Sequence, residues 1–173
     1  MIELVLGGAR SGKSQYAEEL AMKSGLSVTY VATAQARDAE MVARITHHQK
    51  RRPATWHLAE VSSNLAPHLA RLAAPDRFLL VDCLTLWLAN LLDGDDLSLW
   101  EAERLNLLAT LPTLPGTVVL VSNETGLGVV PMGRLTRQFI DEAGRLHQDL
   151  ARLCHRVTFL VAGLPLCLKG AEP

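Results

Sequence analysis

The sequence predicts an α/β fold, with a mostly parallel central sheet and helices on both of its faces. Two observations predict it. Short runs of Val, Ile and Leu alternate along the chain with longer stretches whose apolar residues have helical spacing. The runs contain few polar positions, as expected for parallel strands that are buried on both faces. With 173 residues, 49% of them hydrophobic, residues 1–173 are the right size for a single domain with a sizeable core.

The order of these stretches predicts the individual elements. The apolar runs place strands at 2–6, 28–32, 78–81, 118–122 and 157–161. The amphipathic stretches place helices at 13–24, 38–50, 65–73, 84–92, 99–111 and 133–154. Loops rich in Gly, Asp and Pro are expected at 93–96 and 112–116, since these residues favour turns. The alternation of strands and helices is typical of parallel strands joined by helical crossovers.

Charge and cysteine content exclude several classes of protein. A net charge of -1 and a pI near 6.6 give no electrostatic reason to expect nucleic acid or an anionic membrane as partner. Cys83, Cys154 and Cys167 are odd in number and form no C-x-x-C pair, which argues against a disulfide framework or a zinc site. We therefore expect a protein of the reducing cytoplasm.

No segment of the chain has the pattern of a membrane anchor. The first apolar run contains Glu3 and leads directly into a glycine-rich loop, which is unlike a signal peptide. The longest apolar stretch, 78–92, is interrupted by Asp82 and Asn90 and is too short to cross a bilayer.

The stretch GGARSGKS at 7–14 matches the phosphate-binding P-loop pattern between an expected strand and an expected helix. Glycines allow backbone N–H groups to point at phosphate oxygens, and the helix amino terminus adds its positive dipole. Lys13 adds a full charge and a catalytic role, and Ser14 can hold Mg²⁺. A chance glycine-rich turn is the alternative, but the eight residues match in the required context. The residues expected to bind the nucleotide are Gly7, Gly8, Ala9, Arg10, Ser11, Gly12, Lys13 and Ser14.

An acidic residue ends the apolar run FLLVD at 78–82. In P-loop proteins, a carboxylate at the end of such a strand orients Mg²⁺, and Asp82 is the candidate here. Asp82 could instead cap the helix expected from residue 84, because Asp favours that position. The base-recognition pattern N-K-x-D is absent from the sequence, which weakens the interpretation as a regulatory GTP switch.

The stretch 38–52 combines two histidines with several cations. On a helix, Met41, Ile45 and His48 share one side, whereas His47 lies about 100° away from His48. Neighbouring arginines would keep the imidazole of His48 neutral and attract a polyphosphate, and both effects favour a nucleophilic nitrogen. A solvated basic helix face is the alternative, and it is the commoner meaning of such a charge run.

Segments along nearly the whole chain resemble the bifunctional adenosylcobinamide kinase and adenosylcobinamide-phosphate guanylyltransferase of cobalamin synthesis. They are GGARSGKS at 7–14, ATAQ at 32–35, ARITHHQ at 43–49 with the following RP and W, VDCLT at 81–85, SNETGLGVVP at 122–131 and R-x-x-R-x-F-x-D-x-x-G at 134–144. The resemblance implies a P-loop NTPase-like fold and two activities. ATP or GTP would phosphorylate adenosylcobinamide, and GTP would then guanylylate His48, which would pass GMP to adenosylcobinamide phosphate.

The resemblance also implies further nucleotide contacts, Mg²⁺ as cofactor and a homotrimer. The implied contact residues are Ala32, Thr33, Ala34, Gln49, Lys50, Arg51, Arg52, Glu60 and Asp82. For Ala32 and Ala34 the contact would come from the backbone or from packing, since alanine has no polar side chain. Glu60 could equally be a solvated acid at a strand end.

Several other residues have no assigned step. The loop 123–131 follows an expected strand, where ligands bind in open parallel sheets, but it could also be a structural turn. Arg134 and Arg137 could reach a corrinoid phosphate or a neighbouring subunit. His147 departs from the asparagine that is more usual in the family, and we expect a surface histidine. The tryptophans, Trp56, Trp87 and Trp100, are expected in the core or at subunit contacts, because an indole buries a large apolar area.

Overall fold

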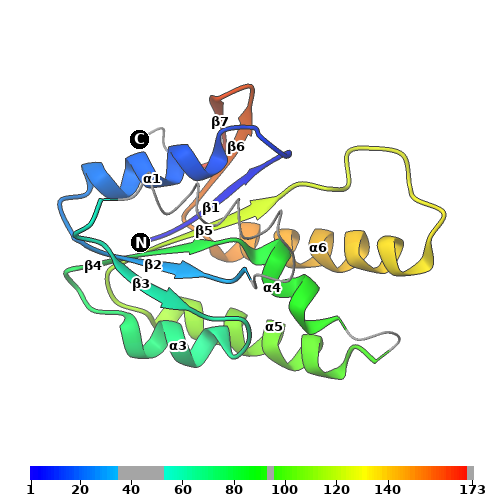
Figure 1. Ribbon diagram of the computed structural model, residues 1–173, viewed down its shortest axis with the longest axis horizontal. Helices are drawn as coiled ribbons and strands as arrows, with labels where there is room; N and C mark the ends of the chain where they lie inside the picture. The colour runs from blue at the N-terminus through cyan, green and yellow to red at the C-terminus, as the bar shows by residue number, and fades with distance from the viewer. Residues whose placement is uncertain (35–52, 93–95, 171–173) are drawn as a thin grey trace.

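The computed structural model describes residues 1–34, 53–92 and 96–170. Its centre is a seven-stranded sheet with the order β3-β2-β4-β5-β1-β6-β7 (Figure 1). The strands are β1 (Ile2–Gly7), β2 (Ser27–Ala32), β3 (His57–Glu60), β4 (Arg77–Asp82), β5 (Thr117–Asn123), β6 (Arg156–Val161) and β7 (Leu164–Lys169). All neighbouring strands are parallel except β6 and β7, which pair antiparallel.

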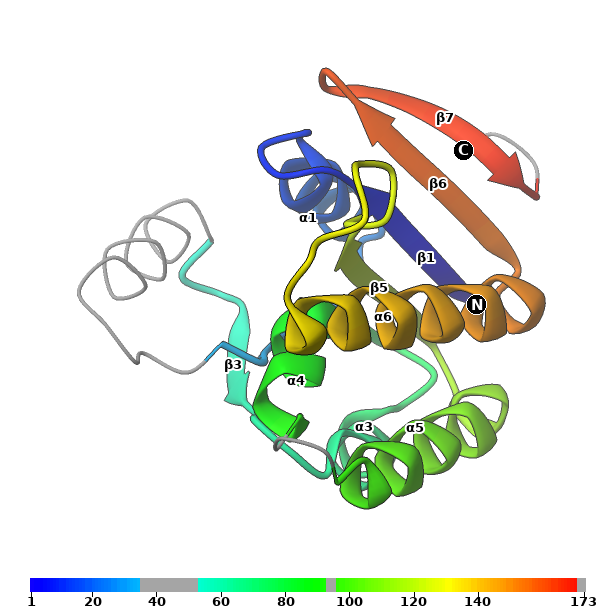
Figure 2. The ribbon, with the colours of Figure 1, turned by 90° about the vertical axis from the view of Figure 1, so that its right-hand side faces the viewer.

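Helices cover both faces of this sheet, as Figure 2 shows. They are α1 (Lys13–Lys23), α3 (Leu65–Leu72), α4 (Leu84–Leu91), α5 (Ser98–Thr110), the short 3-10 helix η1 (Leu111–Thr113) and α6 (Arg134–Leu153). One core cluster packs the inner sides of α3, α4, α5 and α6 against Leu4 and Leu6 of β1. A second cluster packs α1 on the opposite face, against Val5 and the neighbouring strands. The expected α/β architecture is therefore confirmed.

The expected strands and helices within the described residues are found with each end within one residue of its expected position. The expected helix 38–50 lies outside the described residues. In the expected loop 112–116, the structure has η1 over part of the segment. The strands expected from apolar runs did not include β3 or β7. Both are edge strands with mostly exposed side chains, so they lack a buried apolar run, and Pro165 in β7 further obscured the pattern because proline is tolerated only at a sheet edge.

The three tryptophans contribute to packing. Trp87 and Trp100 are fully buried between α4 and α5, and their rings meet edge to face with centroids 5.1 Å apart. The indole N–H of Trp100 donates to the Glu142 carboxylate at 2.8 Å. Trp56 is half-buried and packs against the cluster around α1. The expected core role is thus confirmed for Trp87 and Trp100.

Among the described residues, no helix is both long and apolar enough to cross a membrane.

Candidate active site at the carboxyl ends of the strands

The P-loop connects β1 to α1 at the carboxyl edge of the sheet. Gly12 has φ +95°, a left-handed conformation that favours glycine. A Cβ at Gly12 would lie 3.1 Å from Cα of Gly163. The close approach of these two backbone segments therefore also requires a residue without a side chain at position 12. The ammonium of Lys13 donates to the carbonyl of Gly8 at 3.2 Å. This bond holds the lysine over the loop.

Two neighbouring segments hold the P-loop in place through main-chain hydrogen bonds. The N–H of Glu124, directly after β5, donates to the Gly7 carbonyl at 3.0 Å. The N–H of Gly163, in the turn between β6 and β7, donates to the Ser11 carbonyl at 2.9 Å. The P-loop is therefore held between the loop after β5 and the β6–β7 turn before any phosphate binds.

Lys13 and Asp82 lie close enough at this edge for their charges to interact. Burial lowers the pKa of Lys13, and the negative charge of the Asp82 carboxylate opposes that shift. Lys13 is only 9% exposed, so its charge acts in a poorly hydrated place, where electrostatic attraction to phosphate is stronger than in water.

A tyrosine from the next strand holds the Asp82 carboxylate. The Tyr30 hydroxyl donates to Oδ2 of Asp82 at 2.8 Å. Asp82 does not cap α4, because the N-cap residue is Cys83 and no side chain forms a cap hydrogen bond there. The carboxylate is therefore directed to the edge of the sheet.

Thr33 is buried at the end of β2 and has a structural role in the described structure. Its hydroxyl donates to the Cys83 carbonyl at 2.7 Å and accepts from the Cys83 N–H at 2.9 Å. The Thr33 carbonyl accepts from Asn90 at 2.9 Å. Because these polar groups are already paired, we expect any nucleotide contact here to come from Ala32 and Ala34, which are partly exposed.

The remaining expected contact residues divide into two groups. Glu60 is exposed at the end of β3, opposite Ala32 in the register, so it lies at the same edge of the sheet as the P-loop. The residues His48, Gln49, Lys50, Arg51 and Arg52 lie outside the described residues.

The expectation that His147 lies on the surface is wrong, since its side chain is only 8% exposed. Its Nε2 lies 2.8 Å from the Ser122 hydroxyl, and its Nδ1 lies 3.6 Å from Oε2 of Glu124. Burial lowers the pKa of His147, whereas Glu124 opposes the shift. One signal for this position was present in the sequence, because His147 follows the buried Ala143 by four residues and so shares its side of the helix.

Two buried cysteines, Cys83 and Cys154, are poor candidates for a nucleophile. Burial raises the pKa of Cys83 to about 11 and that of Cys154 to about 12, so both thiols are protonated at neutral pH. Within 1–34, 53–92 and 96–170 there is also no group of three His, Cys, Asp or Glu side chains that could hold a metal on its own.

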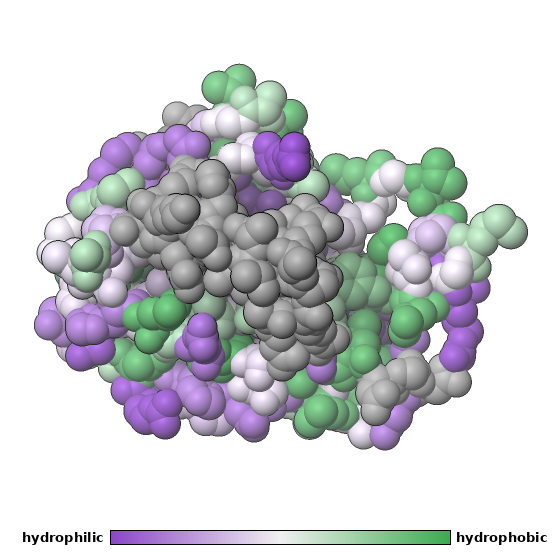
Figure 3. Space-filling view, viewed as in Figure 1, coloured by the Kyte–Doolittle hydropathy of each residue, from purple (hydrophilic) through white to green (hydrophobic). Residues whose placement is uncertain are grey.

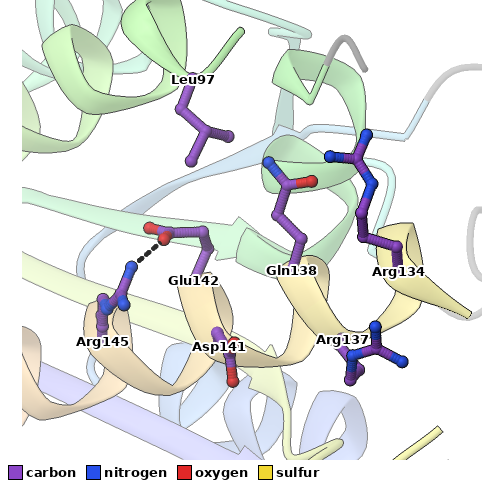
Figure 4. A pocket seen from close by; sticks show the side chains of 7 residues that line it. All are labelled: Leu97, Arg134, Arg137, Gln138, Asp141, Glu142 and Arg145. Carbon is purple, nitrogen blue, oxygen red and sulfur yellow. Dashed lines mark hydrogen bonds and ion pairs between the residues drawn. The ribbon is translucent and has the colours of Figure 1, made fainter. Parts of the chain in front are cut away.

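A hollow of about 310 Å³ lies away from the P-loop, between the amino-terminal half of α6 and the residue before α5 (Figure 4). It is lined by Leu97, Arg134, Arg137, Gln138, Asp141, Glu142 and Arg145. The cations already have protein partners there: Arg145 pairs with Glu142, and Arg137 donates to the carbonyls of Pro131 and Met132. We therefore assign this hollow no role in phosphate binding.

The sheet and its loop define the class of this protein, a P-loop NTPase-like α/β fold. Solved structures of the same class agree. A RadB recombinase matches with a TM-score of 0.51 and 15% identity, over 91% of this chain and 73% of that chain. The P4 protein of bacteriophage phi6 in complex with ADP matches with a TM-score of 0.50 and 14% identity, over 95% and 53% of the two chains. At such low identity these matches show the fold alone.

The chain belongs to the cobinamide kinase / cobinamide phosphate guanyltransferase family, whose model matches residues 3–168. The bifunctional adenosylcobalamin biosynthesis protein CobP of Pseudomonas aeruginosa is 60% identical over 173 residues, which cover 100% of this chain and 99% of that protein. The bifunctional adenosylcobalamin biosynthesis protein CobU of Salmonella typhimurium is 40% identical over 182 aligned residues, which cover 98% and 100%.

Proposed function

We propose that this protein phosphorylates adenosylcobinamide with a nucleoside triphosphate, ATP or GTP, and then transfers GMP from GTP to the new phosphate. The product is adenosylcobinamide-GDP. Membership of the family supports the two activities. The observation that carries the proposal in this chain is the folded P-loop, with Lys13 hydrogen-bonded to the Gly8 carbonyl and close enough to Asp82 for their charges to interact.

In the kinase step, the hydroxyl oxygen of the aminopropanol arm attacks the γ-phosphorus, the bond from that phosphorus to the β–γ bridging oxygen breaks, and the nucleoside diphosphate leaves. The hydroxyl proton passes to solvent. Lys13 and the N–H groups of the P-loop stabilise the negative charge on the phosphates, which is the main contribution a protein makes to this chemistry.

In the second activity, we propose that a neutral imidazole nitrogen of His48 attacks the α-phosphorus of GTP and that pyrophosphate leaves. A phosphate oxygen of adenosylcobinamide phosphate then attacks the same phosphorus, and the P–N bond breaks to release the histidine. The phosphoramidate keeps its transfer potential, so the second half-reaction needs only a positioned acceptor. His48 lies outside the described residues, and the resemblance at 43–49 supports this assignment.

The residues at the edge of the sheet fit Mg²⁺. The Ser14 hydroxyl and the Asp82 carboxylate are oxygen donors, which Mg²⁺ prefers, and they would hold it directly or through water. Tyr30 donates to Oδ2 of Asp82, and Oδ1 would face the ion. When bound, Mg²⁺ neutralises charge on the nucleotide phosphates.

The proposal extends to the nucleotide contacts and to the assembly. Besides the P-loop, we propose contacts from Glu60, from Gln49 to Arg52 and from the end of β2. We also propose a single domain that works as a homotrimer in the cytoplasm. Light scattering of the purified protein would test the trimer directly.

The proposed function is tested by product analysis. Incubation with adenosylcobinamide, Mg²⁺ and GTP should give adenosylcobinamide phosphate and adenosylcobinamide-GDP, separated by chromatography and identified by mass. With ATP alone, no guanylylated product should form. Formation of the phosphate without adenosylcobinamide-GDP, even with GTP in excess, would indicate a P-loop small-molecule kinase without the nucleotidyl-transfer step.

A further inference from the structure

The loop between β5 and α6, residues 124–132, projects beyond the sheet (Figures 1 and 2). Its side chains are unusually apolar for an exposed segment. Val129 is 96% exposed and Met132 is 95% exposed, with Leu127 and Val130 also largely exposed. Figure 3 shows hydrophobic side chains gathered where this loop projects. A contiguous apolar surface of this kind marks a binding site more often than an ordinary turn.

The first residue of the loop is joined to the P-loop. The N–H of Glu124 donates to the Gly7 carbonyl at 3.0 Å, so the loop starts next to the P-loop, and the exposed apolar side chains follow from Leu127 onward. One oxygen of the Glu124 carboxylate, Oε1, accepts a hydrogen bond from the Gly126 N–H at 2.5 Å. The start of the loop therefore has a defined conformation next to the P-loop.

A buried histidine connects this carboxylate to the sheet and to α6. His147 on α6 lies 3.6 Å from Oε2 of Glu124 through Nδ1 and 2.8 Å from the Ser122 hydroxyl of β5 through Nε2. Ser122 is fully buried. Buried polar groups are costly unless they are hydrogen-bonded, and Ser122, His147 and Glu124 satisfy one another. In the described structure, no side chain of these three residues contacts the P-loop.

The far end of the loop is also fixed. The Arg137 guanidinium donates to the Pro131 carbonyl at 3.1 Å and to the Met132 carbonyl. The backbone is thus held at both ends while the apolar side chains between them point to solvent. A loop whose backbone is already ordered in the free protein loses less conformational entropy when a ligand binds.

We propose that loop 124–132 binds the acceptor by contacting the apolar rim of its corrin macrocycle, and that Ser122 and His147 position the loop for this contact. The inference rests on the proposed function, which supplies a macrocyclic acceptor edged with methyl and amide groups. Residues 125–132 contain no charged side chain, so they suit such a rim and not a phosphorylated or nucleic-acid partner. Because Glu124, the residue before them, is hydrogen-bonded to Gly7, an acceptor that reaches the transferred phosphate can extend from the P-loop onto this surface.

The direct test uses surface substitutions that leave the core unchanged. The double variant Val129→Ser/Met132→Ser removes two exposed apolar side chains, and Leu166→Ser on the exposed strand β7 is the matched control. Equilibrium dialysis with adenosylcobinamide, read from its visible absorbance, gives acceptor affinity. We expect about tenfold weaker binding and a similar rise in KM for the double variant, given the free energy of burying an aliphatic side chain. GTP affinity should stay within about twofold for both proteins.

The positioning role of His147 needs a separate pair of variants. His147→Ala removes both interactions, whereas His147→Asn keeps groups that can hydrogen-bond to Ser122 and Glu124. We expect His147→Ala to raise KM for adenosylcobinamide about fivefold, a smaller effect than direct contact loss, without weakening GTP binding, and His147→Asn to restore most of the acceptor affinity. Thermal unfolding followed by circular dichroism identifies any variant that fails to fold.

Three results bear on the inference in different ways. Unchanged acceptor affinity in the double variant would overturn it. If the double variant with unchanged affinity also has a lower molecular mass than the wild type by light scattering, the loop contacts a second copy of the chain instead of the acceptor. Wild-type protein that binds adenosylcobinamide but forms no product would contradict the proposed function, and the dialysis results would still decide the role of the loop.

Discussion

The Tyr30 hydroxyl on β2 donates a 2.8 Å hydrogen bond to Oδ2 of Asp82 at the end of β4. The two strands are neighbours, and Ala32 is paired in register with Asp82, so the tyrosine reaches the carboxylate from two residues earlier on the adjacent strand. In the proposed metal site, the other oxygen of this carboxylate, Oδ1, would be the one that faces Mg²⁺. The hydrogen bond from Tyr30 ties the acidic edge of the site to the core, because Tyr30 is buried among the residues that pack against α1.

Removing this hydrogen bond should weaken the metal-dependent step. We expect Tyr30→Phe to raise the Mg²⁺ concentration for half-maximal kinase activity several-fold and to lower stability by about 1 kcal/mol, the usual cost of a lost hydrogen bond. Mg²⁺ titration of initial rates and urea unfolding measure the two effects. An unchanged Mg²⁺ dependence would show that Tyr30 only supports packing.

We expect Lys13 to lower the stability of the fold while it contributes to kinase activity. Because burial lowers the pKa of Lys13, the charged ammonium is disfavoured in the folded state. Lys13→Met should therefore raise the free energy of unfolding at pH 7 while reducing kinase activity by about 10³-fold through the loss of charge stabilisation. The control is Lys23→Met in the last turn of α1, which should change neither quantity much.

The pH dependence of stability gives a second test of Lys13. Between its lowered folded pKa and the unfolded value of 10.5, the unfolded chain binds more protons at this position than the folded one. The stability of the wild type should therefore rise with pH in that window relative to Lys13→Met. Urea unfolding of both proteins at several alkaline pH values measures the difference. Parallel curves would contradict a buried ammonium.

His147 should make the protein sensitive to acid. Its folded pKa is lowered from 6.5 by burial, against the opposing effect of Glu124, so the unfolded chain takes up a proton first as the pH falls. Stability contributed by neutral His147 is present above pH 6.5 and is lost below it. His147→Asn should flatten the decline of stability below that pH, measured by urea unfolding. A decline identical to that of the wild type would assign the acid sensitivity to other groups.

Two glycines should respond to alanine in opposite directions. Gly12→Ala places a Cβ 3.1 Å from Cα of Gly163 at φ +95°, so we expect a loss of at least about 1 kcal/mol of stability and a loss of GTP binding. Gly144→Ala lies inside α6, where a Cβ meets nothing within 4 Å, and should stabilise the protein by up to about 1 kcal/mol. Thermal unfolding and GTP titration of both variants provide the comparison.

The elements that could be predicted from the sequence are those that depend on residues close together in the chain. The strands β1, β4 and β5 have continuous apolar runs, so their burial on both faces could be predicted from the sequence. The P-loop was predictable because its glycines, lysine and serine are consecutive. By contrast, β3 and β7 pair at the sheet edges, and their short or exposed sequences contain little that distinguishes them from loops.

The unpredicted parts of the site depend on contacts between distant segments. The bond from Tyr30 to Asp82 depends on strand register, which single-sequence patterns do not provide. His147 shares a helix side with Ala143, but a polar side chain suggested an exposed position. The partners that allow its burial, Ser122 and Glu124, lie 25 and 23 positions earlier in the chain, so the sequence pattern around His147 does not reveal them. The same limit applies to Glu124, whose bond to Gly7 joins two loops that only the folded sheet brings together.

The central claim is that His48 carries GMP between GTP and the acceptor. It is tested by incubating wild type, His47→Ala and His48→Ala with α-labelled GTP and Mg²⁺, then denaturing the protein and measuring label retained on the chain. We expect label on the wild type and on His47→Ala, stable in alkali and lost in acid as for a phosphoramidate, and none on His48→Ala. Label that persists in His48→Ala, or its absence from a wild type that binds GTP, would contradict the account.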